Sequence, residues 1–498
     1  MTSMTANPGV ALDMYETAIA SYLTPVMVKT MANEVELTFD YGFRDILSVS
    51  GLQVAADGSI IDGTVTSITE YNDSMVAFTA DGLSVQVTDL LSWIDEGEYT
   101  GIFAQLLRGA TTLTGSDLYD RLYTFGGNDT IIAGMGDDEI HAGGGVNIID
   151  GGVGDDVLSL SGQAGAYSLL TDADAMFLVS AHGRYRVTGI EKFWFDNNDV
   201  TQAEMAGVTA AFDGARYAAG YPDLIAAFAS DPSAASQHFA TVGFGEGRDP
   251  LLFDPLAYIA AYGDLRTAFG TDAAMASRHY VQWGVAEGRT ARFDALAYIA
   301  GYADLRAAFG ADSSAGAAHY IQFGVEEGRT ANFNVTGYLA SNLDLIERFG
   351  NDRTAATAHY ITTGAIEGLS TEGFDGYGYL ANYWDLRAAF GTDAKAAMQH
   401  FVIAGYDENR TDHFRGMEYI ASYSDLIAAY GADSAAGSKH FVLSGMQEGR
   451  AISFDAMAYA KDHPEFQHTY GDDAALWTQH YIDTVRAGMN AAFIGDWM

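Results

Sequence analysis

Residues 115–160 read GSDLYDRLYTFGGNDTIIAGMGDDEIHAGGGVNIIDGGVGDDVLSL. Within this stretch a large aliphatic residue recurs at every ninth position, at Leu122, Ile131, Ile140, Ile149 and Leu158. Two positions before each of them lies a short polar residue: Asp120, Asp129, Asp138, Asn147 and Asp156. In the last four units a glycine stands two positions earlier still, at Gly127, Gly136, Gly145 and Gly154. The stretch is therefore an array of nine-residue repeats, and a short fixed period of this kind indicates a coiled β structure.

The nine-residue period predicts how the chain winds. One aliphatic side chain in each three-residue strand points into a narrow core, and the glycines allow sharp turns because they adopt backbone angles that other residues avoid. Loops of alternate units then stack on one side, so that Asp120, Asp138 and Asp156 line one edge and Asp129 and Asn147 line the other. Stacked loops of this kind offer carboxylate and carbonyl oxygens only, which is the coordination that Ca²⁺ prefers. The alternative is a glycine-rich turn array that holds no metal.

The array resembles the glycine-rich nonapeptide G-G-x-G-x-D-x-U-x of RTX (repeats-in-toxin, hemolysin-type) calcium-binding proteins, which form a parallel β-roll. The resemblance implies Ca²⁺ as the cofactor, with a metal-binding set of Asp120, Gly127, Asp129, Gly136, Asp138, Gly145, Asn147, Gly154 and Asp156. Some units depart from the family pattern: Thr124-Phe125 and Ala133 replace leading glycines, Leu118 replaces a loop glycine, and Asn147 replaces an aspartate. We therefore expect two or three ions, with the pair Asp129 and Asn147 binding most weakly.

The resemblance also implies a route out of the cell. RTX proteins typically leave Gram-negative bacteria through type I secretion machinery, with an uncleaved signal at the C-terminus, here within residues 491–498. The first residues, MTSMTANPGVALDMYE, lack the basic region and apolar core of a Sec-type signal peptide. Because calcium is scarce in the cytosol and abundant outside, such a chain is expected to stay loose until export. We expect a secreted, extracellular protein that folds on binding calcium and is associated with the cell surface.

Composition excludes several classes of function. The 498 residues include 66 acidic and 25 basic side chains, a formal net charge of −41. This charge argues against a nucleic-acid partner, which needs a basic face, and against an anionic membrane surface. The chain has no cysteine, so disulfides, thiolate metal sites and a cysteine nucleophile are impossible. No run of 18 or more apolar residues occurs, so the sequence predicts no transmembrane segment.

A second period, of 40–41 residues, extends from Phe212 to the end of the chain. Its seven units begin at Phe212, Phe253, Phe293, Phe333, Phe374, Phe414 and Phe454. Each unit carries a tyrosine, an acid and a histidine, and most units close with Glu-Gly-Arg. Apolar spacing predicts two or three short helices per unit, and neighbouring units must stack because one unit has too small a core. The unit resembles an uncharacterised helical repeat that accompanies RTX arrays in secreted bacterial proteins, and this resemblance brings no established activity.

Within one unit, residues 293–329, we expect the recurrent acid Asp304 to serve as a helix N-cap, and Asp312 to cap the next helix. That helix is expected to run through His319 to about Phe323. The histidines are separated by a whole unit of the repeat, which is not metal-ligand spacing. We interpret them as packing residues that bond a neighbouring turn or the recurrent acid, and the Glu-Gly-Arg triplet as a salt bridge within the unit.

Residues 1–110 show neither period. They predict a small α+β domain with helices at 12–31 and 90–107, strands at 34–39, 59–69, 75–79 and 83–87, and Asp-Gly turns at Asp57, Asp62 and Asp81. The expected fold class is thus multidomain α+β, with an N-terminal α+β domain (1–112), a short parallel β-roll with capping strands (113–200) and a C-terminal α-helical repeat array (201–498).

No catalytic motif accompanies these segments. The sequence lacks H-E-x-x-H, G-x-S-x-G and a P-loop, and residues 1–110 contain no histidine, so we do not expect an enzyme. We expect a secreted calcium-binding structural protein of the cell surface or extracellular matrix, similar to a surface-layer subunit, whose partners are other copies of itself or a cell-surface polysaccharide. The alternatives are an adhesin that binds a glycan or another partner and, less favoured, a secreted hydrolase.

Overall fold

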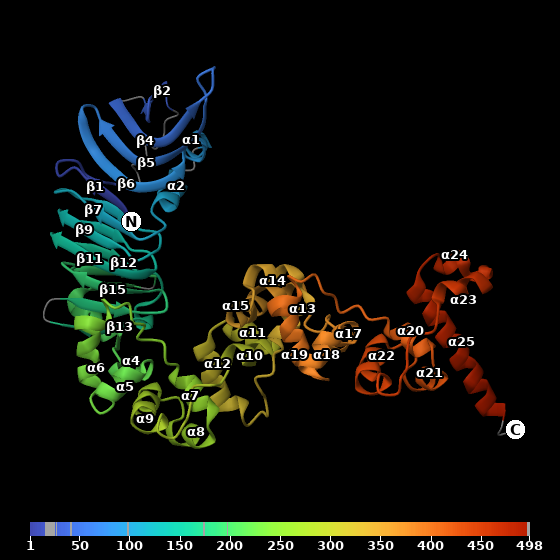
Figure 1. Ribbon diagram of the computed structural model, residues 1–498. Coiled ribbons are helices and arrows are strands. Elements are labelled where there is room, and N and C mark those ends of the chain that lie inside the picture. The colour runs from blue at the N-terminus through green and yellow to red at the C-terminus, as the bar shows by residue number, and fades with distance from the viewer. Residues whose placement is uncertain are drawn as a thin grey trace. The chain divides into compact units, whose positions relative to one another are not determined.

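A computed structural model of the chain describes residues 1–14, 25, 27–39, 42–96, 99–172, 175–196 and 198–495. The chain divides into two compact parts, Met1–Pro255 with Asp272–Ala291, and Leu256–Thr271 with Arg292–Met498. The N-terminal region is rich in β-structure and includes parallel strands, and the C-terminal region is helical (Figure 1).

Strands of the described residues form two sheets. The larger has thirteen strands in the order β18-β13-β14-β15-β11-β9-β7-β1-β6-β5-β4-β3-β2, and the smaller has five in the order β17-β16-β12-β10-β8. The larger sheet consists of β1 (Thr2–Ala6), β2 (Met27–Met31), β3 (Glu34–Thr38), β4 (Phe43–Val54), β5 (Ile60–Asn72), β6 (Met75–Gln86), β7 (Thr111–Thr114), β9 (Thr130–Met135), β11 (Gly145–Val153), β13 (Ser168–Thr171), β14 (Met176–Val179), β15 (Gly183–Thr188) and β18 (Ala210–Ala211). The smaller consists of β8 (Arg121–Tyr123), β10 (Glu139–His141), β12 (Val157–Ser159), β16 (Lys192–Phe195) and β17 (Asn198–Thr201).

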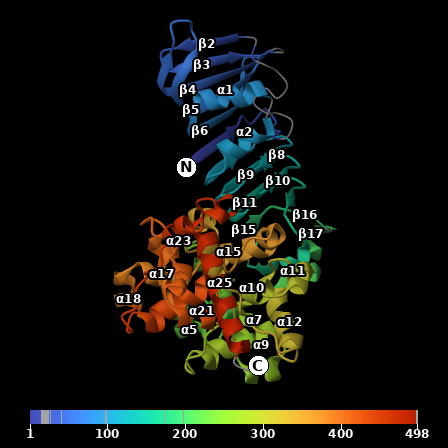
Figure 2. The ribbon, with the colours of Figure 1, turned by 90° about the vertical axis from the view of Figure 1, so that its right-hand side faces the viewer.

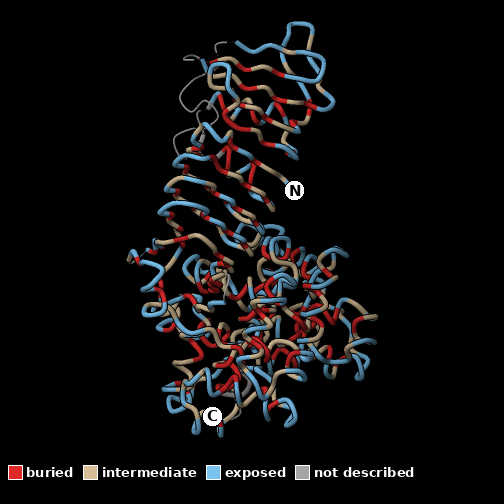
Figure 3. The backbone as a smooth tube through the Cα atoms, turned by 90° about the vertical axis from the view of Figure 1, so that its left-hand side faces the viewer, coloured by how far each residue is buried: buried red, intermediate tan, exposed pale blue. Residues whose placement is uncertain are grey.

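The N-terminal strands β2 to β6 form an antiparallel meander, and β1 joins β6 to the parallel strand β7. Helices α1 (Val87–Glu96) and α2 (Tyr99–Leu106) contact this part of the sheet and share its core with the roll that follows. Figure 3 shows that buried positions alternate with exposed ones along these strands. One sheet and one core thus continue past residue 112 into the next segment, and residue 112 itself lies within β7.

Three N-terminal expectations are wrong, and one of them is the turn at Asp62-Gly63, which lies inside β5. Residues 27–31 of the expected first helix form strand β2, and residues 15–24 and 26 lie outside the described residues. The expected turn at Asp81-Gly82 lies inside β6, where Asp81 pairs with Ser67 but Val85 pairs with Val65, so the glycine forms a bulge. The expected second helix corresponds to α1 and α2, and residues 97–98 lie outside the described residues.

Residues 111–195 form a roll with two faces of parallel strands. On one face Leu113, Ile131 and Ile149 lie side by side, and on the other Leu122, Ile140 and Leu158 do. Neighbours on each face are separated by two nonapeptides, so one coil of the roll holds two units of the short period. All six side chains are fully buried, which confirms the predicted narrow aliphatic core. Strand β15 and strand β16 extend the two faces by one further coil.

The C-terminal region is built mainly from short helices and ends in the longer helix α25 (Figure 2). They are α3 (Met205–Val208), α4 (Gly214–Ala219), α5 (Pro222–Phe228), α6 (Pro232–His238), α7 (Pro255–Ala261), α8 (Gly263–Phe269), α9 (Ala273–His279), α10 (Ala295–Ala300), α11 (Ala303–Phe309), α12 (Ser313–His319), α13 (Val335–Ser341), α14 (Leu343–Phe349), α15 (Arg353–His359), α16 (Ala365–Glu367), α17 (Gly376–Asn382), α18 (Trp384–Phe390), α19 (Ala394–His400), α20 (Gly416–Ala421), α21 (Ser424–Tyr430), α22 (Ser434–His440), α23 (Ala456–Asp462), α24 (Gln467–Tyr470) and α25 (Ala474–Gly495). Of the residues 491–498 expected to carry a secretion signal, 491–495 lie in α25 and 496–498 are outside the described residues. Within the described chain, none of these helices is long and apolar enough to cross a membrane.

The segment 293–329 shows how the helices are held. Asp312 caps α12 by accepting a hydrogen bond from the Ala315 amide at 2.9 Å, as predicted, and the helix continues as a π-helical turn, Tyr320–Gly324. The expectation that Asp304 caps α11 is wrong, because Tyr302 occupies the cap and Asp304 instead accepts from Arg329 at 2.7 Å. Arg329 also pairs with Glu327 at 2.7 Å, which confirms a salt bridge within the unit.

The recurrent histidines bond to the recurrent tyrosines. In six units the tyrosine hydroxyl lies 2.8–3.1 Å from Nδ1 of the histidine 21 residues later, and the pairs are Tyr217–His238, Tyr298–His319, Tyr338–His359, Tyr379–His400, Tyr419–His440 and Tyr459–His480. This contact agrees with the predicted packing role of the histidines, and the partner at Nδ1 is the recurrent tyrosine, not the recurrent acid or a neighbouring turn.

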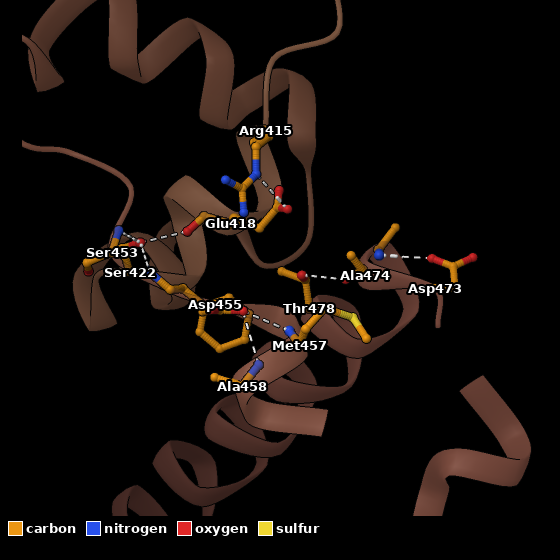
Figure 4. A network of polar contacts seen from close by, with 12 residues as sticks. Arg415, Glu418, Ser422, Ser453, Asp455, Met457, Ala458, Asp473, Ala474 and Thr478 are labelled. Carbon is orange, nitrogen blue, oxygen red and sulfur yellow. Dashed lines mark hydrogen bonds and ion pairs between the residues drawn. The ribbon is translucent and has the colours of Figure 1, made fainter. Parts of the chain in front are cut away.

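Near the end of the chain, one unit of the long period is joined to the next by hydrogen bonds between a side chain and the backbone (Figure 4). The Ser422 hydroxyl, at the end of α20, accepts hydrogen bonds at 2.9 Å from the amides of Ser453 and Phe454 just before α23. Asp455 then caps α23 through the amides of Met457 and Ala458. A polar side chain at the end of one helix thus fixes where the next unit begins.

Candidate calcium-binding site

The first row of predicted ligands forms a stack along one edge of the roll, which we call the first ladder (Asp120, Asp138, Asp156). The amide of Asp120 donates to Oδ1 of Asp138 at 2.8 Å, and the amide of Asp138 donates to Oδ1 of Asp156 at 2.8 Å. The amide of Asp156 continues the row by donating to Glu191 at 2.9 Å. All three aspartates are buried, so the expected alignment of alternate units on one edge is confirmed.

The other edge carries the second ladder (Asp129, Asn147). The amide of Thr111 donates to Oδ1 of Asp129 at 2.9 Å, and the amide of Asp129 donates to Oδ1 of Asn147 at the same distance. The Asn147 side chain then donates from Nδ2 to the carbonyl of Gly143 at 2.9 Å. Both ends of the Asn147 amide are thus used by the protein itself.

The aspartates of the first ladder have spare capacity that Asn147 lacks. Oδ2 of Asp138 and Oδ2 of Asp156 are buried and accept no hydrogen bond from the described residues, and the same holds for Oδ2 of Asp129 in the second ladder. Asp120 differs, because the amide of Ser116 donates to its Oδ2 and the amide of Leu12 donates to its Oδ1. A buried acceptor without a donor costs free energy, so two consecutive coils each present an oxygen that is suited to a cation.

The loop glycines allow the coils to approach closely. Gly127, Gly136, Gly145 and Gly154 all have positive φ, at 106°, 114°, 115° and 155°. A Cβ on Gly145 would lie 1.7 Å from the carbonyl oxygen of Gly127, and one on Gly154 would lie 1.8 Å from that of Gly136. Gly145 therefore lies against Gly127, and Gly154 lies against Gly136, each one coil apart. The four predicted loop glycines thus form two columns along the roll.

A leading glycine also makes room for the carboxylate. A Cβ on Gly151 would lie 2.7 Å from the unpartnered Oδ2 of Asp156. The carboxylate therefore lies over the loop of its own nonapeptide, beside backbone carbonyls that can complete an oxygen-only site.

Burial changes the acidity of both ladders. It raises the pKa of Asp120, Asp129 and Asp156 above the usual value, and it raises the pKa of Asp138 to about 7. At Asp138 the charges of Asp120 and Asp156 add to the effect of burial on the pKa. Without a cation, these carboxylates therefore take up protons more readily than exposed ones.

The donor set fits a hard cation that is bound mainly by backbone oxygens. No group of three or more His, Asp or Glu side chains arranged to hold a metal occurs among the described residues. Sites between successive coils would instead combine one or two carboxylates with loop carbonyls, which suits Ca²⁺ and does not suit metals that need nitrogen or sulfur ligands.

Sequence reasoning missed Glu191, which extends the first ladder. Its signal is nevertheless present, because Glu191 precedes Phe193 by two residues, the same spacing as Asp156 and Leu158, and Phe193 pairs with Leu158. No glycine-rich loop with the nine-residue period surrounds it in the sequence, and the period alone therefore did not reveal it.

Comparison with known protein families agrees with this geometry. A family model of four copies of the RTX calcium-binding nonapeptide repeat matches residues 108–139 and 123–158. Among solved structures, the extracellular lipase LipA from Serratia marcescens is similar, with 26% identity and a TM-score of 0.18. The similarity covers 19% of this chain and 17% of the lipase chain. No curated protein matches this chain. Residues 108–158 are therefore RTX nonapeptide repeats, which bind Ca²⁺.

Proposed function

We propose that the two ladders and their loop glycines hold calcium between successive coils, and that calcium binding completes the folding of the roll. The proposed binding set is Asp120, Gly127, Asp129, Gly136, Asp138, Gly145, Asn147, Gly154 and Asp156. The aspartates contribute carboxylate oxygens, and the glycines allow loop carbonyls to approach. The observation that carries the proposal is the buried, unpartnered Oδ2 of Asp138 and of Asp156.

Calcium, when bound, supplies the positive charge that the ladders lack. The protein contributes the geometry, because Asp138 and Asp156 are each held at Oδ1 by the amide of the preceding coil. With that positive charge present, the ladder carboxylates stay deprotonated despite the burial that raises the pKa of Asp138. Without calcium, the roll keeps its aliphatic core and the hydrogen bonds between coils, but it lacks the metal ions that would bridge the coils.

We further propose that the protein is secreted by a type I system and has a structural role at the cell surface or in the extracellular matrix, where it associates with copies of itself or with a polysaccharide. A calcium-dependent fold suits a protein that must stay loose in the calcium-poor cytosol and become rigid outside. The recurrent polar residues of the helical region support a non-catalytic role, because His319, Arg329 and their equivalents are used to hold helices together.

Binding of a glycan, as an adhesin, is the second candidate. It is favoured by one specific observation, a groove in the helical region that carries two cationic side chains.

Calcium titration of the metal-free full chain tests the proposal, with near-ultraviolet circular dichroism and thermal unfolding as readouts. We expect calcium to raise the unfolding temperature of the roll and chelator to reverse the effect. Asp138→Asn should weaken the calcium response about tenfold or more, whereas Asp155→Asn removes the same charge from an exposed side chain and should leave it unchanged. A roll whose stability is indifferent to calcium and chelator would overturn the proposal.

The surface role needs a separate measurement. Electron microscopy and light scattering at high protein concentration, with calcium, should show ordered sheets or filaments if the chain assembles. A monodisperse monomer in calcium would contradict self-assembly and leave the glycan-binding role.

A further inference from the structure

Helices α13, α15 and α19 belong to the second compact part of the chain (Figure 1). Residues of these helices and of the segments just before α13 and α19 line a groove of about 540 Å³. The side chains that give it its chemical character are Asn332, Asn334, Thr336, Arg353, Lys395 and Gln399. They come from two consecutive units of the long period and the residue just before them, and α13 contacts both α15 and α19. The groove therefore combines polar side chains with apolar surface, and it carries two cationic side chains in a chain whose net charge is −41.

The two cations of the groove are not neutralised by the protein. In the described part of the chain, neither Arg353 nor Lys395 forms an ion pair, although Nη1 of Arg353 donates to the Thr336 hydroxyl at 2.7 Å. The arginines that close several units are instead paired with carboxylates, as in Arg329–Asp304, Arg410–Asp385 and Arg450–Asp425. The groove thus retains positive charge that is available to a ligand.

The long period provides an internal comparison for the groove. Arg353 directly follows the capping aspartate of its helix, where other units have Ala273, Ser313, Ala394 and Ser434. Lys395 is one position further along, where other units have Ala274, Ser314, Thr354 and Ala435. Both positive charges are therefore departures from the pattern, and both departures line the same groove.

A third departure removes a negative charge. Asn334 caps α13 by accepting from the Gly337 amide at 3.0 Å, at a position where most other units have an aspartate, as at Asp254, Asp294, Asp375 and Asp455. The acid that does line the groove, Asp393, is engaged at 3.0 Å by the amides of Lys395 and Ala396. The electrostatic balance of the groove therefore favours an anion.

The remaining lining groups favour a polyhydroxylated anion. Side-chain amides at Asn332 and Gln399 each offer both donors and an acceptor, which suits vicinal hydroxyls. The half-buried Phe333 and Met398 add apolar surface against which a sugar ring can pack. An arginine pairs well with a carboxylate because its planar guanidinium donates two parallel hydrogen bonds.

We propose that this groove binds an acidic saccharide, a uronic-acid unit of a surface polysaccharide, with Arg353 and Lys395 holding its carboxylate and the amides holding its hydroxyls. This inference rests on the proposed surface role, and it names the chemical class of the polysaccharide that the protein would bind there. The groove lies outside the roll, so saccharide binding and calcium binding are tested by different variants.

The test is calorimetric titration of the calcium-loaded full chain with a galacturonic acid trisaccharide, which is too short to form a calcium gel. We expect saturable binding that weakens as salt concentration rises, because salt screens the two cations. Arg353→Ala and Lys395→Ala should each weaken binding at least fivefold, and Arg353→Lys should restore part of it. Arg348→Ala removes an exposed positive charge from the same unit, outside the groove, and should leave binding unchanged.

Two further ligands and one further variant separate the outcomes. A neutral trisaccharide of the same length should bind at least fivefold more weakly, and equal binding would overturn the role of the charge. If a hexaglutamate peptide competes as well as the acidic saccharide, the groove selects for negative charge alone. That result would overturn the saccharide as the inferred ligand in favour of an acidic peptide. Asp138→Asn should impair the calcium response but retain saccharide binding, so failure of the groove and failure of the calcium sites are distinguishable. No binding of the acidic saccharide by the folded wild-type chain would overturn the proposal.

Discussion

The amide of Asp120 donates a 2.8 Å hydrogen bond to the carboxylate of Asp138, a residue 18 positions later in the sequence. This bond links one coil of the roll to the next and orients the carboxylate, and no described residue donates to the buried Oδ2 of Asp138. Folding of this segment therefore places the carboxylates of the first ladder in a row along the roll, and a bound cation would offset their mutual repulsion.

Calcium affinity should rise with pH because binding displaces protons from the first ladder. The pKa of Asp138 is raised from 3.8 to about 7, so the metal-free folded roll holds more protons than the unfolded chain between these values. This contribution to stability is present in acid and is lost as pH rises through about 7, whereas calcium binding becomes stronger over the same range. Titrations at pH 5.5 and 7.5, in buffers of different ionisation enthalpy, should show tighter binding at pH 7.5 and proton release at pH 5.5. Equal affinity and no proton release would contradict the ladder as the calcium site.

Adding a side chain at Gly145 should disrupt the roll. Its φ is 115°, and a Cβ would lie 1.7 Å from the Gly127 carbonyl oxygen, so Gly145→Ala combines backbone strain with a clash between coils. We expect a loss of at least about 2 kcal/mol in the unfolding free energy of the roll, measured by urea denaturation in calcium. Gly58→Ala, at a φ of 90° with nothing within 4 Å, is the matched control and should cost less. Equal losses would mean that the coils do not approach as described.

Replacing Asn147 by aspartate should make the second ladder more dependent on calcium. The side-chain amide of Asn147 already has protein partners, because Oδ1 accepts from the amide of Asp129 and Nδ2 donates to the carbonyl of Gly143. Asn147→Asp removes that donor and buries a second carboxylate next to Asp129, which should destabilise the metal-free roll and strengthen calcium binding. The measurement is unfolding temperature with chelator and with saturating calcium. If Asn147→Asp shifts the unfolding temperature by the same amount in chelator and in saturating calcium, the second ladder does not hold a cation.

The Tyr–His pairs should stabilise the helical region independently of calcium. Tyr298 is fully buried, and its hydroxyl lies 2.9 Å from Nδ1 of His319. Tyr298→Phe removes this hydrogen bond and should cost about 1 kcal/mol, measured by urea unfolding with and without chelator. Tyr430→Phe, at a partly exposed ring, should be nearly neutral. A loss that appears only in chelator would mean that the helical region depends on the roll.

The roll could be predicted in detail because its physics is periodic. A nonapeptide repeat with alternate units on one side requires each strand to pair with the strand two units away, and the structure pairs Ile140 with Leu122 and with Leu158. The Asp312 cap was predictable for a similar reason, since it depends on a local amide three residues away. Where a bond joins residues 21 apart, as between Tyr298 and His319, recurrence identified both residues but not their contact.

The N-terminal sheet was less predictable because its signals are interrupted. Strand β4 was not expected. Its buried Asp45 pairs with Glu70 on β5. An alternating strand pattern would have an apolar residue at such a buried position, so the pattern is interrupted there. Burial and the charge of Glu70 raise the pKa of Asp45 well above its usual value. The Asp-Gly pairs at 62 and 81 were also misinterpreted, because a glycine with positive φ fits a strand bulge as well as a turn.

The most direct test of the account is to count bound calcium ions on the intact chain by native mass spectrometry, with and without chelator. We predict two or three ions on the wild-type chain, fewer on Asp138→Asn, and an unchanged number on Asp155→Asn. A folded wild-type chain that carries no calcium at millimolar concentration would contradict the central claim that the ladders of the roll are calcium sites.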